Sequence, residues 1–391
     1  MRRLLAVVIP IIVLLGGCSE QSQDKPMATD VANLPEPATL PAADEYPAQL
    51  IMVAYSQLAK AAEAAEALLS SARSLQKRAS GKTLNEARKH WRAGYSAYLA
   101  SLAAANTPVR EPTEWYAAGL TRVHLAKQIN SWPIEPGYID YLKGYPFTGI
   151  VNDTTLSIDR DSLLSQHLFS DSSYVAVGYH ALEFILWGED GKRPASDFDV
   201  TATLPDADDG IAAPVLHQQR RTDYLITLTQ LLIDDLKRLQ MRWAPDRGHY
   251  AQTLTTATPA ETLQASLLTV TRLIEQDLLQ HYLTDLGSSP YSAGTPMDVQ
   301  ALLMGVRQIL LPESLQAGLV PLLPPHQNDT PNPLLNQLRS NLSEDSACSA
   351  GWQTATSYIE GQAACRQQML ELLITLKEIS DELGLQVPVS G

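Results

Sequence analysis

The chain has 391 residues, of which 45% are hydrophobic and 18% are charged, and its formal net charge is −14. This length exceeds the usual size of a single core, so we expect one large domain or two medium ones. An aromatic content of only 6%, with runs rich in Ala, Leu and Gln, favours helices. The negative charge argues against nucleic acid or an anionic lipid surface as the main partner, and it is compatible with a cationic ligand.

The beginning of the chain has the features of a bacterial export signal. A basic start precedes an apolar run from Leu4 to Leu15, which is too short to span a membrane. The run ends in Leu-Gly-Gly-Cys18, which resembles a lipobox and implies cleavage before Cys18 and lipidation of its thiol; an ordinary secretory signal is the alternative. Residues 19–46 are rich in Pro, Ala and Gln and predict a tether without secondary structure. We therefore expect a lipid-anchored protein of the cell envelope, facing the periplasm or the outer-membrane surface.

Helical periodicity runs through most of the chain after the tether, and no convincing alternation of period two marks a strand. The expected helices span residues 48–77, 84–105, 112–128, 157–169, 172–187, 215–243, 259–286, 297–310, 312–320, 334–342 and 352–383. The expected fold is therefore all-α. We predict two packed domains that each resemble a four-helix bundle, residues 47–245 and 246–391, with the boundary near a Pro-Asp-Arg-Gly break.

Two stretches lack a helical period. Residues 132–156 are rich in Pro, Gly and Tyr, and a long irregular segment inside a compact domain usually has a function. We expect this segment to be an ordered loop packed over the helix predicted at 172–187. Residues 188–214 form a second predicted loop, which is rich in Asp.

The helix predicted at 172–187 carries the strongest chemical signal. His180 and Glu183 are three residues apart and therefore project from one helix face, where an imidazole and a carboxylate can both reach one divalent ion. Gly178 leaves the backbone open to a close approach. The alternative is a buried His and Glu that hydrogen-bond to ordinary neighbours.

Gly178-x-His180-x-x-Glu183, continuing as Phe-Ile-Leu-Trp-Gly, resembles the signature of the imelysin family, which is also called the M75 peptidase family. Further blocks resemble that family in the same order, at residues 129–134, 136–141, 149–153, 193–198 and 220–225. The resemblance covers roughly residues 45 to 385. It departs from the family at 288–298, where many members carry Ser, Asn, Thr and His.

The resemblance implies a cell-envelope protein that binds a divalent metal ion and takes part in iron uptake or homeostasis. The resemblance makes iron the expected ion. Zinc and copper are alternatives, because nitrogen and oxygen ligands suit all three metals. We expect His180 and Glu183 to be ligands, and a carboxylate of the 132–156 loop to complete the shell: Glu135, Asp140 or Asp153. The expected partners are the free ion or a metal complex, the membrane through the lipid anchor, and other iron-uptake components.

We expect the metal ion to lie in a pocket between the His180 helix and the 132–156 loop. Five residues are candidates for its walls: Arg92, Trp132, Tyr138, Gly178 and Trp187. Two other functions remain open, a metallopeptidase and a binding module for haem, a siderophore or a polymer. No His is followed by Glu, and Phe184 follows Glu183, so neither zinc-peptidase helix motif is present. We therefore favour a binding protein over an enzyme.

Two cysteines remain after the predicted lipidation site. Cys348 and Cys365 are an even pair in a chain that we expect to be exported to an oxidising compartment, so we predict a disulfide between them. Two free buried thiols are the alternative.

Overall fold

The computed structural model describes residues 43–201, 217–313, 317–323, 325 and 330–388. Within these ranges the chain is helical and contains no β-strand, although Leu142 and Tyr145 form an isolated antiparallel bridge. The prediction of an all-α fold is therefore confirmed. The predicted export signal with Cys18 lies outside the described residues, as does part of the acidic loop. No helix in the described part of the chain is long and apolar enough to cross a membrane.

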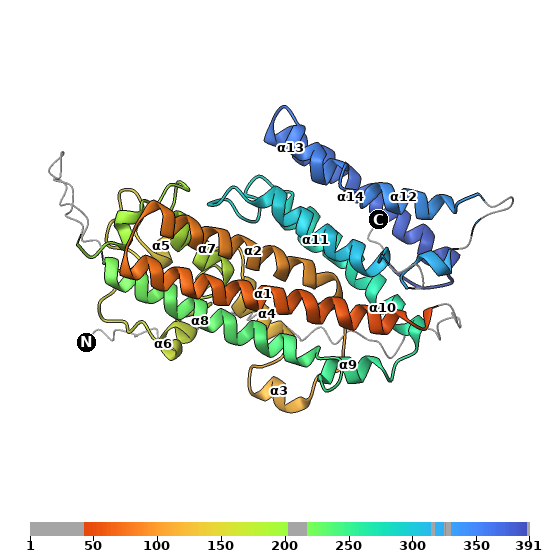
Figure 1. Cartoon of the computed structure of the whole chain (residues 1–391), viewed down its shortest axis with the longest axis horizontal. Helices are drawn as coiled ribbons and strands as arrows, with labels where there is room; N and C mark the ends of the chain where they lie inside the picture. Colours follow the sequence, from red (N-terminus) through yellow and green to blue (C-terminus); the bar gives the residue numbers. More distant parts are fainter. Residues whose placement is uncertain (1–42, 202–216, 314–316, 324, 326–329, 389–391) are drawn as a thin grey trace, which may run out of the picture. The chain divides into compact units, whose positions relative to one another are not determined.

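Three long helices form the frame of the fold: α1 (Tyr46–Lys77), α2 (Gly81–Ala105) and α8 (Gln218–Arg242). α1 packs along both α2 and α8 (Figure 1). Its buried face combines leucines with many alanines, and these small side chains let neighbouring helices approach closely. Ser80 begins α2 with a capping box, in which its side chain and that of Thr83 each accept from the other's backbone N–H.

The segment between α2 and α8 consists of short helices joined by irregular loops. These are α3 (Thr113–Ala117), α4 (Arg122–Asn130), α5 (Pro136–Ile139), α6 (Arg160–Gln166), α7 (Tyr179–Trp187) and the 3₁₀-helix η3 (Ala195–Phe198). The helix predicted at 112–128 is broken, because Gly119 has a positive φ of 63° and separates α3 from α4. The loop predicted at 132–156 is ordered, and within these residues α5 is the one helical segment.

The helix that carries His180 is shorter than predicted. α7 begins at Tyr179; residues 172–178 form turns and irregular backbone, and Gly178, directly before the helix, has a φ of +95°. Asp171 does not cap α7; its carboxylate accepts from the backbone N–H of Ser173 within a preceding turn. A Cβ atom at position 178 would lie 2.5 Å from the carbonyl oxygen of Gln128, so the glycine lets α7 start directly against the end of α4.

The elements after α8 are α9 (His249–Leu254), α10 (Pro259–Arg272), the π-helix η4 (Leu273–Tyr282), α11 (Thr295–Leu310), the 3₁₀-helix η5 (Val320–Leu322), α12 (Pro333–Asn341), the π-helix η7 (Ala347–Gly351), α13 (Trp352–Thr354) and α14 (Tyr358–Glu382). The sequence did not predict α9. The helix predicted at 259–286 continues as a π-helix, and the last predicted helix is interrupted before Ser357, which caps α14. In the described part of 312–320, Val320 belongs to a 3₁₀-helix rather than an α-helix.

The segments before and after residue 245 share a packed interior. α11 lies along α2, and α10 packs against both α1 and α2 (Figure 1). Gly305 of α11 lies so close to α2 that a Cβ atom there would be 2.2 Å from the carbonyl oxygen of Ala100. The division into two bundles at residue 245 stays a prediction.

Cys348 and Cys365 are joined by a disulfide, as predicted. The bond links η7 to α14 across 17 residues of sequence. It therefore ties the segment that follows α12 to the last long helix.

Candidate functional site

α7 delivers His180 and Glu183 side by side in the interior. Both side chains are buried, and Nδ1 of His180 lies 3.4 Å from Oε2 of Glu183. α2 holds α7 in place, because the Trp91 indole N–H donates to the carbonyl oxygen of Tyr179 at 2.8 Å. The spacing of three residues thus produces the shared face that the sequence predicts.

The other edge of the imidazole faces Tyr95, which in turn lies against Tyr282. Nε2 of His180 lies 3.1 Å from the phenol oxygen of Tyr95 on α2. That oxygen lies 3.4 Å from the phenol oxygen of Tyr282, the last residue of η4. The Trp132 ring packs against the imidazole with 4.8 Å between ring centroids. Both nitrogens of His180 therefore have polar neighbours, and Trp132, one of the predicted pocket residues, packs against the ring.

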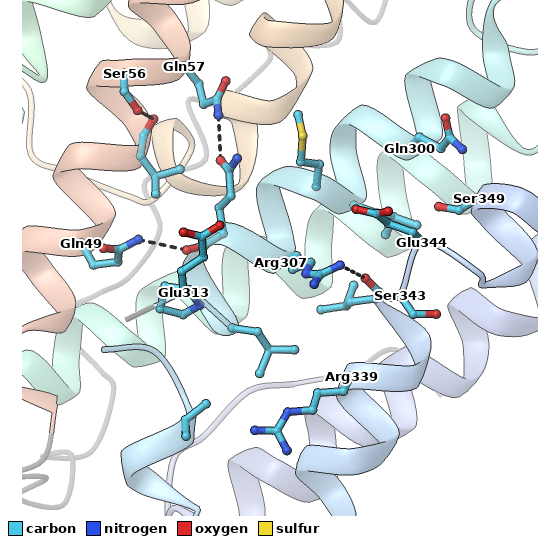
Figure 2. A pocket seen from close by; sticks show the side chains of 18 of the residues that line it. Gln49, Ser56, Gln57, Gln300, Arg307, Glu313, Arg339, Ser343, Glu344 and Ser349 are labelled. Carbon is cyan, nitrogen blue, oxygen red and sulfur yellow. Dashed lines mark hydrogen bonds between the residues drawn. The ribbon is translucent and has the colours of Figure 1, made fainter. Parts of the chain in front are cut away.

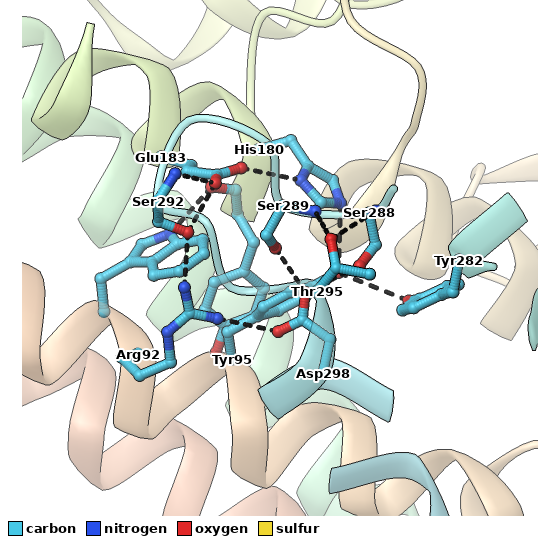
Figure 3. A network of polar contacts seen from close by, with 12 residues as sticks. Arg92, Tyr95, His180, Glu183, Tyr282, Ser288, Ser289, Ser292, Thr295 and Asp298 are labelled. Carbon is cyan, nitrogen blue, oxygen red and sulfur yellow. Dashed lines mark hydrogen bonds and ion pairs between the residues drawn. The ribbon is translucent and has the colours of Figure 1, made fainter. Parts of the chain in front are cut away.

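The segment 288–298 closes the site from the far end of the chain (Figure 3). The backbone N–H and the hydroxyl of Ser292 donate to Oε1 of Glu183 at 2.8 and 2.7 Å. Arg92 donates to the Ser292 hydroxyl oxygen with one nitrogen and to Oδ1 of Asp298 with another, the latter at 2.8 Å. Arg92, one of the predicted pocket residues, therefore joins α2 to the beginning of α11.

Asp298 is the second buried carboxylate of this network. Ser288 and Ser289 donate to its Oδ2 at 2.7 and 2.5 Å. Burial raises the pKa of Asp298 to about 6, and the charge of Glu183 acts in the same direction, whereas Arg92 and the two serine hydroxyls oppose it. The network thus holds two buried carboxyl groups and one guanidinium, which pairs with Asp298 and reaches Glu183 only through Ser292. It therefore has a surplus of negative charge when both carboxyl groups are ionised and His180 is neutral.

The three loop carboxylates do not join this pair. Glu135 is exposed and caps α5, accepting from the backbone N–H of Gly137 at 3.3 Å. Asp153 is also exposed and accepts from the backbone and hydroxyl of Thr155. Among the residues that the structure describes, no three or more His, Cys, Asp or Glu side chains are grouped to hold a metal ion.

Asp140 is buried but fully used elsewhere. Arg221 donates to both of its oxygens, at 2.6 and 2.9 Å, and Arg193 lies 2.9 Å from Oδ2. Burial alone would raise the pKa of Asp140, but the two arginines hold it below its usual value. Arg193 also pairs with Asp197. Two aspartates and two arginines thus form a buried cluster with balanced charge, which anchors the 132–156 loop through Asp140.

Two of the predicted pocket residues contact side chains other than His180 and Glu183. Tyr138 stacks on Tyr174 at 4.4 Å and donates to the carbonyl oxygen of Gln166. Trp187 packs edge-on against Trp91, and the Arg88 guanidinium lies over its ring. Gly178 acts through the backbone, as the residue before α7.

Six residues of the network were not predicted as site residues from the sequence: Tyr95, Tyr282, Ser288, Ser289, Ser292 and Asp298. Tyr95 follows Arg92 by three residues on α2, and this helical spacing was the available signal. The block 288–298 looked like a departure from the family, yet its Ser292 donates to Glu183, and its Ser288 and Ser289 donate to Asp298.

A separate cleft of about 1210 Å³ lies between α1, α11, α12 and η7 (Figure 2). Its lining mixes apolar side chains with polar ones, and the polar ones include Gln49, Gln57, Gln308 and Arg307. The Gln57 amide donates to the side-chain oxygen of Gln308 at 2.8 Å, which joins α1 to α11. None of the residues lining this cleft belongs to the His180 network, so it is not the predicted pocket.

These features define a class of all-helical proteins with a buried GxHxxE helix. The chain belongs to the imelysin family, because the family model described as Peptidase_M75, Imelysin, matches residues 54–383. A search of curated proteins found no match.

Two solved structures have a similar fold. An imelysin-like protein from Psychrobacter arcticum 273-4 is 15% identical, with a TM-score of 0.57 over 90% of this chain and 98% of that one. A "putative iron-regulated protein A precursor" from Parabacteroides distasonis ATCC 8503 is 14% identical, with a TM-score of 0.59 over 90% and 99%. At these identities the likeness concerns the fold.

Proposed function

We propose that this imelysin-family chain is a lipoprotein of the bacterial cell envelope that binds a divalent metal ion, iron by preference, at His180 and Glu183. Its role would lie in iron uptake or homeostasis. The observation that carries the proposal is the buried His180–Glu183 pair in a network with surplus negative charge. A buried carboxylate without a countercharge is costly, and a bound cation removes that cost.

The donor chemistry of the pair fits such an ion. Ser292 occupies Oε1 of Glu183, which leaves Oε2 directed at Nδ1 of His180. A neutral imidazole that binds through Nδ1 carries its proton on Nε2 and donates it to Tyr95, and such an acceptor on the other nitrogen is usual for metal-binding histidines. Nitrogen and oxygen donors suit iron, zinc and copper.

The pair supplies two ligands, so the remaining coordination positions fall to water or to donor atoms of a chelating molecule. This favours an exchangeable ion or a metal complex over a permanently held structural ion. A catalytic zinc site would need about three protein ligands and a base. The described residues bring together no such group, so a peptidase is the less supported function.

The link to iron and to the envelope rests on separate observations. One structurally similar protein is named as iron-regulated. The basic start, short apolar run and Leu-Gly-Gly-Cys18 support a lipid anchor in the membrane. Other iron-uptake components of the envelope are the proposed partners.

Metal-induced thermal stabilisation tests this function. We expect Fe²⁺ or Zn²⁺ to raise the Tm of the mature protein, because an ion at 100 times its Kd adds about 2.7 kcal/mol to the free energy of unfolding. A double variant, His180→Ala with Glu183→Ala, should lose this response, and elemental analysis should show the same loss of metal. Asp153→Ala is the matched control and should keep it. Equal stabilisation of the wild type and the double variant would place the ion elsewhere.

A further inference from the structure

The cleft between α1, α11, α12 and η7 is large enough to hold a ligand of its own (Figure 2). Its volume of about 1210 Å³ exceeds the range of about 300–1,000 Å³ that is usual for small-molecule sites. One of its walls, η7, is a π-helix, and such segments occur frequently at functional sites. The size of the cleft suits an elongated ligand better than a single amino acid or a simple organic acid.

Charged side chains around the cleft form no ion pair within the described part of the chain. The cationic ones are Lys60, Arg307 and Arg339, and the anionic ones are Glu313 and Glu344. All of them are exposed, and the one hydrogen bond among them is a long contact of 3.5 Å from Arg307 to the carbonyl oxygen of Leu342. Charges of both signs are therefore open to a ligand, which favours a molecule that carries both.

Glutamine amides form much of the polar lining. Gln49 and Gln57 donate to the main-chain and side-chain oxygens of Gln308, at 3.1 and 2.8 Å, and their own side-chain oxygens accept from no described residue. Gln300 and Gln353 also line the cleft, and their side chains make no hydrogen bond with a described residue. A glutamine amide donates and accepts as a peptide group does, so this lining can pair with a polypeptide main chain.

The apolar part of the lining is aliphatic. It includes Val53, Leu303, Met304 and Leu342, and a methionine adapts its shape to different side chains. None of the described lining residues is aromatic, whereas nucleotide bases usually stack on aromatic rings. A ligand with several negative charges and no positive one would be repelled by the two glutamates. Nucleotides and polyanions therefore fit this cleft poorly.

We propose that the cleft binds a short peptide with free termini. Arg307 and Arg339 bind its C-terminal carboxylate, because the planar guanidinium group matches a carboxylate with two parallel hydrogen bonds. Glu313 and Glu344 attract its N-terminal ammonium group. The glutamine amides pair with its main chain, and the aliphatic residues contact its side chains. Because every peptide carries these main-chain groups, the cleft tolerates many peptide sequences.

The cleft binds the peptide without hydrolysing it. None of the described residues lining it is a His, Cys or Asp, so no base of these types stands beside the ligand to activate water. The cleft also shares no residue with the network of His180 and Glu183. The inference is therefore independent of the proposed metal position.

The test is isothermal titration calorimetry of the mature protein with tetra-alanine, its C-terminal amide and its N-acetylated form. We expect the free peptide to bind, and each blocked form to bind about tenfold more weakly, because it lacks one charged contact.

Arg307→Gln and Arg339→Gln should weaken binding of the free peptide by about tenfold but leave the affinity for the amide unchanged, because the two changes remove the same contact. Arg247→Gln is the matched control, since Arg247 is an exposed arginine outside the cleft, and it should bind all three peptides as the wild type does. All three variants should keep the metal-induced shift in Tm.

Three results would overturn the proposal. The first is a dissociation constant for tetra-alanine weaker than about 1 mM. The second is equal affinity for the free peptide and its amide, because the arginines would then not bind a carboxylate. The third is full displacement of the peptide by an equal concentration of glutarate, which would show that the cleft takes small organic anions instead.

Discussion

The role of each residue in the site depends on which of its polar atoms are already bonded to a neighbour. His180 and Glu183 could be predicted because their relation is local, within one turn of helix. Asp140 could not, because its oxygens are taken by Arg193 and Arg221, which are remote in the chain. A carboxylate in the sequence carries no sign of whether its partner will be a metal or a guanidinium.

Asp235 on α8 illustrates the cost of a poorly compensated buried carboxylate. Burial raises its pKa to about 6; Arg238 and Arg160 oppose the shift, and Asp234 adds to it. The folded pKa thus lies above the unfolded value, so the folded state holds the proton more tightly. This contribution to stability is fully present below about pH 4 and is lost as the pH rises through about 6.

We expect Asp235→Asn to remove this pH-dependent loss of folding stability, because the amide does not titrate. Each pKa unit corresponds to about 1.4 kcal/mol, so the variant should gain up to about 3 kcal/mol over the wild type at pH 7.5 relative to pH 4. Urea unfolding at several pH values measures the difference. Glu86→Gln, at an exposed position on α2, is the control and should follow the wild type. Parallel pH profiles for Asp235→Asn and the wild type would contradict the assigned burial.

The helical period of the apolar residues located most of the helices, but it does not predict the local backbone conformation. The run before Gly178 has helical character in sequence, yet residues 172–178 form turns and irregular backbone, and the helix begins only after Gly178, whose φ is positive. In the same way, the apolar pattern of 259–286 does not distinguish an α-helix from the π-helix that carries Tyr282. Backbone geometry of this kind depends on neighbours such as the end of α4.

Gly178→Ala tests the start of α7. Its Cβ atom would lie 2.5 and 2.6 Å from the carbonyl oxygens of Gln128 and Ile129, at a φ that L-residues rarely adopt. Backbone atoms cannot move aside cheaply, so we expect a loss of at least about 3 kcal/mol in the free energy of unfolding. Denaturant unfolding measures it. Gly81→Ala, where a Cβ atom meets nothing within 4 Å, should be nearly neutral. Similar stabilities for the two variants would argue against this conformation of Gly178.

At the scale of the whole molecule, the site is assembled from segments far apart in the chain. α2 supplies Arg92 and Tyr95, α7 supplies His180 and Glu183, and the segment before α11 closes the network. The sequence predicted the all-α class from composition and period alone. It could not predict this closure, because a polar block near residue 290 contains no signal for the helix against which it will pack.

The packing of α11 on α2 therefore controls both stability and site geometry. Gly305 lies against the backbone of Ala100, and Asp298 lies about two turns earlier on α11. A methyl group at position 305 would sit 2.2 Å from a carbonyl oxygen, so the two helices must separate. We expect Gly305→Ala to lose about 2–4 kcal/mol in the free energy of unfolding.

The same separation should loosen the Arg92–Asp298 contact and reduce metal-induced stabilisation, although position 305 contacts no ligand group directly. Met304→Ala is the control, because Met304 is an exposed neighbour on α11 and surface changes usually alter stability by less than about 0.5 kcal/mol. Denaturant unfolding and the metal-induced shift in Tm are measured on both variants. If Gly305→Ala lowers stability but leaves the full metal response, α11 stabilises the fold without shaping the site.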